Sequence, residues 1–213
     1  MHVLVLASQK GGVGKTTLAR HLAVAAGEAG CGPVVLLDAD PQGGLAAWWN
    51  RRQAATPVFF SSSLAELPGR LEQARAGGFK LAVIDTPPQI TSLIRAAVTL
   101  ADLVLIPTRP SPDDLDALGR TIDIVEAAAR PMVFVINAAT RHARITGQAA
   151  IALSQSGTVA KPVIGQSVAF PTSSIDGRVV GELDGGSTSA KEIAELWTYV
   201  ETRLRKSARA EAA

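Results

Sequence analysis

The chain has 213 residues, of which 47% are apolar and 19% are charged. This length and apolar content suffice for one domain with a sizeable buried core. Lysine and arginine number 21 against 19 for aspartate and glutamate, so a basic surface for nucleic acid would have to be a local patch. Cys31 is the only cysteine, which excludes an intramolecular disulfide and a cysteine-based metal cluster within one chain.

Targeting signals are not apparent in the sequence. No stretch reaches the roughly 18 apolar residues of a membrane span. A strand-like run begins at His2 with no basic region or cleavage site before it. We therefore expect a cytoplasmic protein without membrane insertion. Residues 1–206 are expected to form a single domain, and residues 207–213, which are small or charged, a disordered tail.

Short β-rich apolar runs alternate with longer helical patterns along the chain. The expected strands are 2–7, 34–37, 57–60, 81–84, 103–106, 132–136 and 162–164. The expected helices are 16–29, 63–76, 91–101, 112–129, 146–155 and 189–205. This alternation predicts a doubly wound α/β fold, in which a mostly parallel sheet carries helices on both faces.

A glycine-rich segment separates the first expected strand from the first helix. It reads Gln9-Lys10-Gly11-Gly12-Val13-Gly14-Lys15-Thr16-Thr17. Glycines let successive backbone N–H groups face one concavity, and the helix N-terminus adds partial positive charge there. Lys15 would reach the β- and γ-phosphates of ATP, and the Thr16 hydroxyl would ligate Mg²⁺. The standard phosphate loop has glycine in place of Gln9, but the coincidence of strand, GKT and helix favours a phosphate loop over a turn without ligand.

Aspartates end two of the expected strands. Asp38 and Asp40 follow the run at 34–37, and Asp85 follows the run at 81–84 in a Walker B pattern. Ligands of open α/β sheets collect at such strand ends. A lone aspartate there is more often a turn former, but beside a phosphate loop Asp85 is expected to hold Mg²⁺ through water. Spacing alone does not decide which of Asp38 and Asp40 serves the metal and which serves the attacking water.

The segment KGGVGKTT, with Lys10 five positions before Lys15, resembles the deviant Walker A motif of the ParA/MinD superfamily. In that family this signature lysine reaches the nucleotide of the partner subunit, so the resemblance implies an ATP-dependent homodimer. A cation placed onto the developing γ-phosphate charge acts as an arginine finger does, which agrees with catalytic roles for Lys10 and Lys15. The alternative is a solvated lysine at a loop edge.

Other segments are similar to ParA-family blocks in the family's order: DADPQGG at 38–44, VIDTPP at 83–88 and IPTRPSPDDL at 106–115. The resemblance implies that Asp38 lies near the metal and that Asp40 orients or activates the attacking water. VIN at 135–137 and VAFP at 168–171 resemble the strand end and the loop beside adenine. They would place Asn137, Phe170 and Pro171 at the base, although Asn137 could instead be a turn former.

The resemblance covers about residues 2–200. Small ParA-type proteins are the expected subgroup, because the first strand begins at His2 and leaves no room for an N-terminal helix-turn-helix. The resemblance implies a switch ATPase that partitions plasmid or chromosome DNA, or positions a large cargo, over the nucleoid. Such a protein binds DNA without sequence preference in its ATP state and is activated by a ParB-like partner on the cargo. The candidate phosphate contacts, any of which could be a solvated charge, are Arg178, Arg203, Arg205 and Lys206.

Two alternatives belong to the same superfamily. A MinD-like membrane switch would need an amphipathic C-terminal helix, whereas the apolar stripe from Ile193 to Leu204 falls within the final domain helix and favours core packing. An ATP-dependent amidoligase or carboxylase, such as cobyrinic acid diamide synthase, would need a substrate pocket. The DADPQ and PTRPSP matches speak against that activity.

Overall fold

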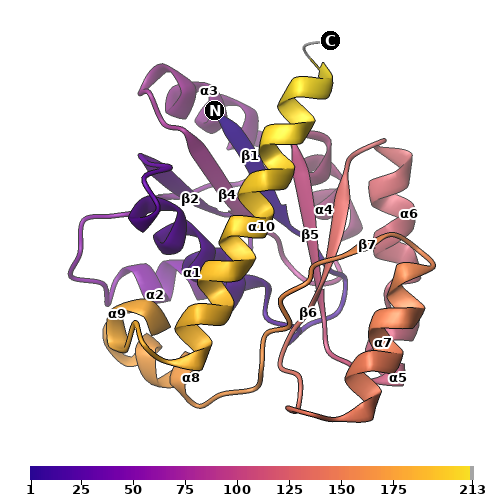
Figure 1. The fold of residues 1–213 in the computed structure, drawn as a ribbon. Helices are drawn as coiled ribbons and strands as arrows, with labels where there is room; N and C mark the ends of the chain where they lie inside the picture. The colour runs from indigo at the N-terminus through magenta and orange to yellow at the C-terminus, as the bar shows by residue number, and fades with distance from the viewer. Residues whose placement is uncertain (212–213) are drawn as a thin grey trace.

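The computed structural model describes residues 1–211, built around one seven-stranded sheet (Figure 1). The strand order is β3-β2-β4-β1-β5-β6-β7, and every neighbouring pair is parallel. The bounds are β1 (His2–Leu6), β2 (Val34–Asp38), β3 (Val58–Ser61), β4 (Leu81–Asp85), β5 (Leu103–Thr108), β6 (Met132–Ile136) and β7 (Thr158–Val159). The predicted parallel sheet is confirmed.

Helices cover both faces of the sheet, so that successive side chains of the central strands are buried on either face. Leu4 and Leu6 of β1 face one apolar cluster, and Val3 and Val5 face the other. The first cluster is closed by α1 (Lys15–Glu28), α2 (Gly44–Trp49), α8 (Ala169–Ser173), α9 (Val180–Leu183) and α10 (Thr188–Glu211). The second is closed by α3 (Leu67–Ala76), α4 (Thr91–Thr99), α5 (Pro112–Asp116), α6 (Gly119–Ala127) and α7 (Arg144–Ser154). Two single 3-10 turns, η1 (Leu64–Glu66) and η2 (Ser174–Asp176), complete the elements.

Two predicted elements are wrong. The strand expected at 162–164 is not formed, and the edge strand is β7 instead. Ala160 donates to the Phe134 carbonyl and Ile164 to the Ile136 carbonyl, so residues 161–163 bulge from the edge, where Pro162 has no N–H to donate. The helix expected at 112–129 divides into α5 and α6, because the chain tightens into a turn just before Gly119, a residue that weakens helices.

Other boundaries also differ from expectation. The segment 168–171, expected to be a loop, begins the short helix α8. The last helix continues past residue 205 as far as Glu211, so the tail expected from 207 is helical to that point, and residues 212–213 lie outside the described residues. Within residues 1–211, none of the helices combines the length and apolar character that crossing a membrane requires.

His21 ties the first helix to α8. Its side chain is buried, its Nδ1–H donates to the Thr17 carbonyl at 2.7 Å, and its ring meets Phe170 edge-on at 5.1 Å between centroids. Burial, and then the nearby Arg20 charge, lower the pKa of His21 to about 3, although the Thr17 carbonyl acts in the opposite direction. The imidazole is therefore neutral in the folded protein at physiological pH.

The His21 pKa predicts a pH-dependent stability. In the unfolded chain the group titrates near pH 6.5, so between about 6.5 and 3 only the unfolded state takes up this proton, and stability falls as the pH falls. From pH 7 to 5, His21 should cost about 2 kcal/mol of the free energy of unfolding. Urea unfolding of wild type and His21→Gln at both pH values measures this difference. Equal losses in the two proteins would contradict a neutral, buried His21.

Candidate functional site

The carboxyl ends of β1, β2 and β4 meet at one edge of the sheet. In the parallel register, Leu6 of β1 stands beside Asp85 of β4, and Asp85 stands beside Asp38 of β2. The glycine-rich segment leaves β1 two residues after Leu6 and enters α1 at Lys15. Strand pairing therefore brings the loop and two of the predicted carboxylates together, as expected of an open α/β sheet.

The loop is held from β5 and β6. The Asn137 side-chain amide donates to the Val13 carbonyl at 2.7 Å, and Arg109 Nη2 donates to the Gly12 carbonyl at 2.5 Å. Gly14 precedes α1 with a φ of 99°, and a Cβ there would lie only 2.1 Å from Asn137 Nδ2. Since no side chain caps α1, the amides of its first turn are available to an anion.

Thr16 and Asp85 lie together, and we call them the metal flank because Mg²⁺ is expected there. The Thr16 hydroxyl donates to Asp85 Oδ2 at 2.6 Å, and Asp85 Oδ1 is buried with no hydrogen-bond partner among residues 1–211. Burial raises the pKa of Asp85 to about 7, and the Thr16 hydrogen bond and the Lys15 charge only partly oppose this effect. A divalent cation would bind to Asp85 Oδ1 and stabilise the buried carboxylate charge, so these residues fit Mg²⁺.

The acidic side chains alone do not complete a metal site. Among the described residues, no group of three or more His, Cys, Asp or Glu side chains could hold a metal ion by itself. Mg²⁺ commonly takes one or two carboxylates and completes its octahedron with waters and phosphate oxygens. The arrangement thus fits a metal that arrives with a nucleotide.

Asp38 and Asp40 lie in different environments. Asp38 is buried, its two oxygens accept the backbone N–H groups of Asp40 and Ala46, each at 3.0 Å, and burial raises its pKa. Asp40 is partly exposed, and its Oδ1 accepts the N–H of Gln42 at 2.9 Å. Asp38 thus lies against Asp85 and Asp40 lies further out. This placement agrees with the metal and water roles expected of them, which remain predictions.

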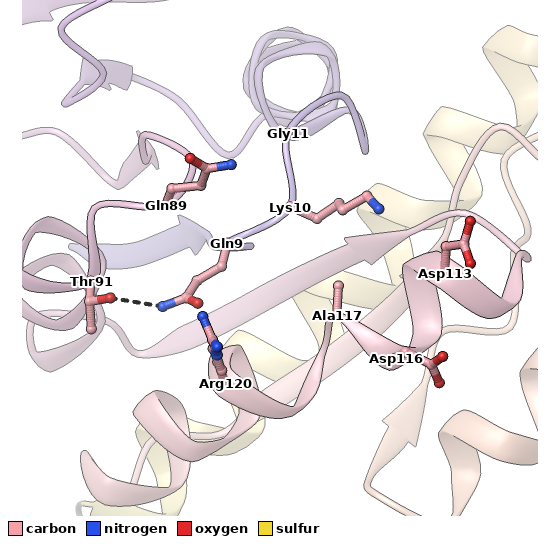
Figure 2. A pocket seen from close by; sticks show the side chains of 9 residues that line it. All are labelled: Gln9, Lys10, Gly11, Gln89, Thr91, Asp113, Asp116, Ala117 and Arg120. Carbon is pink, nitrogen blue, oxygen red and sulfur yellow. Dashed lines mark hydrogen bonds between the residues drawn. The ribbon is translucent and has the colours of Figure 1, made fainter.

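The two lysines of the loop are placed differently. Lys15 is 6% exposed, its ammonium donates to the Lys10 carbonyl at 3.2 Å, and burial lowers its pKa although Asp85 and Asp40 favour the charged form. Lys10 is partly exposed, and its side chain extends over an open cavity of about 700 Å³ on the side of Asp113 (Figure 2). The ammonium of Lys10 makes no ion pair with any residue of the described chain.

A second cavity, of about 480 Å³, lies on the other side of the loop. Its wall includes the three residues predicted to surround the base, Asn137, Phe170 and Pro171, together with Gly12, Gly14 and Thr17 of the loop. Several lining residues were not predicted, namely Arg109, Ala138, Gly165, Gln166 and Ser167. Arg109 stands in the quoted block 106–115, but nothing in that block indicated a contact with the loop. Residues 166 and 167 carry no local signal.

The predicted DNA contacts do not form one patch. Near the C-terminal end of α10 lie Arg203, Arg205 and Lys206. Arg178 lies just before α9, close to the N-terminal end of α10 (Figure 1). Arg178 pairs with Asp176 at 2.8 Å, and Arg205 pairs with Glu201. Arg203 donates to the Tyr199 hydroxyl at 3.0 Å. Lys206 is exposed. Their role in DNA binding stays a prediction.

A parallel sheet, a glycine-rich loop that enters a helix, and aspartates on adjacent strand ends define a P-loop nucleotide-binding protein. The chain belongs to the family of CobQ/CobB/MinD/ParA nucleotide binding domains, whose model matches residues 4–180. The family suggested by the sequence motifs is confirmed.

Two relatives of the chain are named for carboxysome distribution and for chromosome partitioning. The chain is 44% identical over 122 residues to maintenance of carboxysome distribution protein A of Gloeobacter kilaueensis, covering 56% of this chain and 55% of that protein. It is 33% identical over 177 residues to the chromosome partitioning protein ParA of Caulobacter vibrioides, covering 62% and 66%. The chain thus spans between half and two thirds of the length of these relatives.

A solved structure confirms the fold. The septum site-determining protein MinD of Pyrococcus horikoshii, in complex with Mg-ADP, superposes with a TM-score of 0.80 over 97% of this chain and 98% of that one. The two sequences are only 16% identical, so the likeness concerns the fold.

The geometry of Gly14 predicts the effect of one added methyl group. Gly14→Ala should weaken nucleotide binding by at least about tenfold, because the positive φ costs about 1–2 kcal/mol and the new Cβ collides with Asn137. Gly27→Ala on the same helix is the matched control, since a Cβ there meets nothing within 4 Å. Titration with a fluorescent ADP analogue measures both. Wild-type affinity in Gly14→Ala would contradict the assigned loop conformation.

Proposed function

We propose that this chain is an ATPase switch that dimerises around Mg-ATP and, in that state, positions a large cargo or partitions DNA over the nucleoid. One observation carries this proposal. Lys15 is buried at the candidate nucleotide site, whereas Lys10, in the same loop, forms no ion pair among the described residues and lies at the edge of an open cavity. A lysine so placed is available to a second molecule.

Each chemical requirement of ATP binding has a candidate residue in the site. Lys15 and the first-turn amides of α1 would hold the β- and γ-phosphates. Thr16 and Asp85, with Asp38 behind them, would hold Mg²⁺. The bound metal would neutralise negative charge on the phosphate oxygens. The cavity between Asn137 and Phe170 would take the base, and the buried amide of Asn137 would at the same time hold the loop through Val13.

The proposed reaction is hydrolysis of the terminal phosphate. Asp40 orients a water molecule, the water oxygen attacks the γ-phosphorus, and the bond from that phosphorus to the β–γ bridging oxygen breaks. ADP leaves with the bridging oxygen, one water proton remains on inorganic phosphate, and the other passes to solvent. Lys10 of the second copy would stabilise the charge that develops on the transferred phosphoryl group, as an arginine finger does.

The cavity beside Lys10 suits a second copy of the chain. Its wall carries both signs of charge, with Lys10 from the loop and Asp113, Asp116 and Arg120 from α5 and α6 (Figure 2). A two-fold interface repeats the same surface on both subunits, so a surface with both signs of charge can complement itself. Gln9 is fixed at the inner edge of the cavity by its hydrogen bond to Thr91 at 3.0 Å, which gives this surface a defined shape.

The relatives support the biological part of the proposal. Their names concern carboxysome distribution and chromosome partitioning, two tasks that move a large object in the cell. We propose that the ATP dimer of this chain binds duplex DNA without sequence preference in the cytoplasm. A cargo-bound, ParB-like partner would stimulate hydrolysis and thereby release the dimer. Two copies of a weak basic patch in one dimer raise avidity without any new contact.

Lys10→Ala tests whether Lys15 binds the subunit's own nucleotide while Lys10 acts on the nucleotide of the second copy. The variant should bind ATP with nearly wild-type affinity, because its own loop and metal flank are intact. Partner-stimulated hydrolysis should fall by about a thousandfold, the usual effect of removing a finger residue. Lys80→Ala, which removes an exposed lysine before β4 at the far end of the sheet, is the control. Undiminished stimulated hydrolysis in Lys10→Ala would rule out the proposed role.

The DNA proposal is tested with duplexes of random sequence. Wild type with ATP should bind them, and wild type with ADP should bind much more weakly. Changing Arg203 and Arg205 together to Glu should weaken binding to all sequences alike and reduce its salt dependence. Lys191→Glu, an exposed change near the other end of α10, should have little effect. If ATP-bound wild type has no affinity at about 50 mM salt, the nucleoid part of the proposal is wrong.

A further inference from the structure

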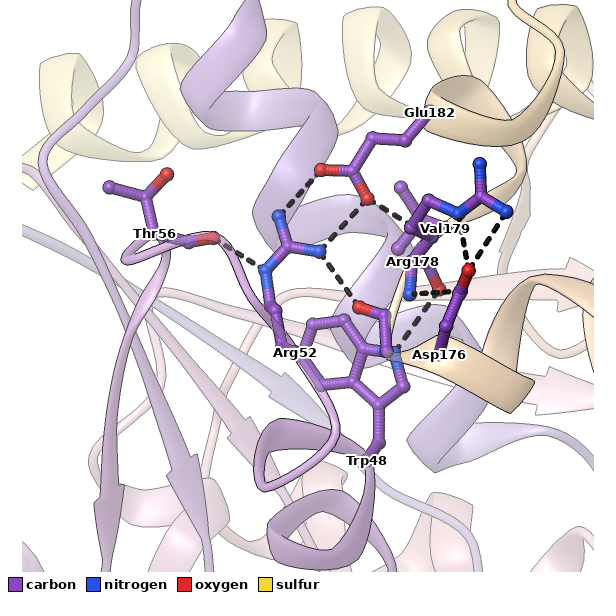
Figure 3. Close-up of polar contacts among 8 residues, drawn as sticks. Trp48, Arg52, Thr56, Asp176, Arg178, Val179 and Glu182 are labelled. Atoms are coloured by element: carbon purple, nitrogen blue, oxygen red, sulfur yellow. Dashed lines mark hydrogen bonds and ion pairs between the residues drawn. The ribbon is translucent and has the colours of Figure 1, made fainter.

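The sequence did not indicate the ion pair between Arg52 and Glu182, which lies next to the C-terminal end of α2. The Arg52 side chain is only 3% exposed and meets Glu182 through two parallel contacts, Nη2 to Oε1 at 2.6 Å and Nη1 to Oε2 at 2.9 Å (Figure 3). The same guanidinium donates to the carbonyls of Thr56 at 2.7 Å and Gly177 at 2.9 Å. Such a bidentate, fully hydrogen-bonded pair fixes orientation as well as distance.

Trp48 extends this pair into the core. Its ring is fully buried and has the Arg52 guanidinium 5.2 Å from its centroid, while the Arg20 guanidinium of α1 lies 6.0 Å away. The indole N–H donates to the Arg178 carbonyl at 3.2 Å. We call Trp48, Arg52 and Glu182 the latch. It joins the end of α2 to α9 and, through the Arg178 carbonyl, to the segment before α9.

The backbone segments joined by the latch pack closely against each other. Gly177 has a φ of 77°, and a Cβ at this position would lie 2.3 Å from the backbone nitrogen of Arg52. No side-chain rotation could relieve that contact. Burial alone would raise the pKa of Glu182, but hydrogen bonds from Arg52 and from the Val179 N–H outweigh burial and hold the pKa below its usual value. The two segments therefore stay in contact with Glu182 charged.

The latch connects the two flanks of the nucleotide site. At the start of α2, the Ala46 N–H donates to Asp38, and Gly44 lies near Thr16, since a Cβ added at Gly44 would stand 3.7 Å from Thr16 Cγ2. On the other side, α8 carries Phe170 and Pro171, and the Ser174 carbonyl that follows it accepts a hydrogen bond from Arg51 at 3.0 Å. We call Phe170 and Pro171 the base flank. The start of α2 thus contacts the metal flank, and the residues just after its end contact the segment that follows the base flank.

We propose that Arg52, through the latch, is a positioning residue that makes the metal flank and the base flank respond to each other. A base seated against Phe170 holds α8 and the segment after it, the latch holds α2 in turn, and Ala46 keeps the Asp38 carboxylate aimed at the metal flank. This inference deepens the proposed function, on which it rests for the use of Mg-nucleotide. It needs nucleotide binding and does not need hydrolysis, dimerisation or DNA.

The first experiment measures how much Mg²⁺ strengthens the binding of ADP. Dissociation constants of ADP with MgCl₂ and with EDTA give this factor for each variant. Glu182→Gln removes the charge and keeps the shape. The double variant Arg52→Met with Glu182→Met removes both buried charges, so that neither is left unpaired. Asp176→Asn is the matched control, because it breaks the exposed Asp176–Arg178 pair in the same segment.

The Mg²⁺ factor should fall by about fivefold or more in both latch variants, within the usual range of coupling between sites, and should stay at the wild-type value in Asp176→Asn. Circular dichroism verifies that each variant is folded. A purely structural role would lower the melting temperature and leave the Mg²⁺ factor unchanged. An unchanged factor in a folded latch variant, or an equal loss in Asp176→Asn, would overturn the inference.

A second experiment needs no variant. Hydrogen exchange of the α2 amides in wild type is compared in pyrophosphate and in ADP, both at saturation without Mg²⁺. Pyrophosphate fills the phosphate loop alone, whereas ADP also fills the base cavity. If the latch transmits base binding, ADP should slow exchange in residues 44–52 clearly more than pyrophosphate does. Equal protection by the two ligands would overturn the inference even if the latch variants fail to fold.

Discussion

The parallel register of β1, β2 and β4 is the constraint on which the rest of the structure depends. It sets Leu6, Asp85 and Asp38 side by side at one edge of the sheet. Because successive side chains of a strand point to opposite faces, a slip of one residue in β4 would turn Asp85 away from Thr16. The hydrogen bond of 2.6 Å between these two residues therefore depends on the pairing of the whole strand, and the metal flank depends on that hydrogen bond.

The protein buries the charges proposed to serve its own nucleotide and leaves partly exposed the charge proposed to serve the nucleotide of a second copy. Lys15, Asp38 and Asp85 are each less than 9% exposed, whereas Lys10 faces an open cavity from the same loop. Buried charges are costly without their ligand, and the raised pKa of Asp85 together with the lowered pKa of Lys15 expresses that cost. Nucleotide and metal would relieve it, so ligand binding and local order are expected to be linked.

The sequence predicted those elements whose signal lies in consecutive residues. Strands β1, β2, β4, β5 and β6, the glycine-rich loop and Asp85 each have a contiguous signal, and they lie where expected. The short helices α2, α8 and α9 were missed, because helices of four to six residues carry too little periodicity and depend on tertiary packing. The contact of Arg109 with Gly12 and the Arg52–Glu182 pair join residues far apart in the chain. Only the folded sheet brings such residues together, so no local pattern could reveal them.

The most direct test of a switch that closes around nucleotide is to mix two inactive proteins. Lys10→Ala keeps its own Asp40 but cannot supply the lysine, whereas Asp40→Ala supplies the lysine but cannot orient water. If Lys10 acts on the other subunit, a mixed dimer contains one complete site. Random pairing should then restore about a quarter of the wild-type ATPase rate, because half of the two-fold dimers are mixed. A mixture no more active than either variant alone would contradict the account.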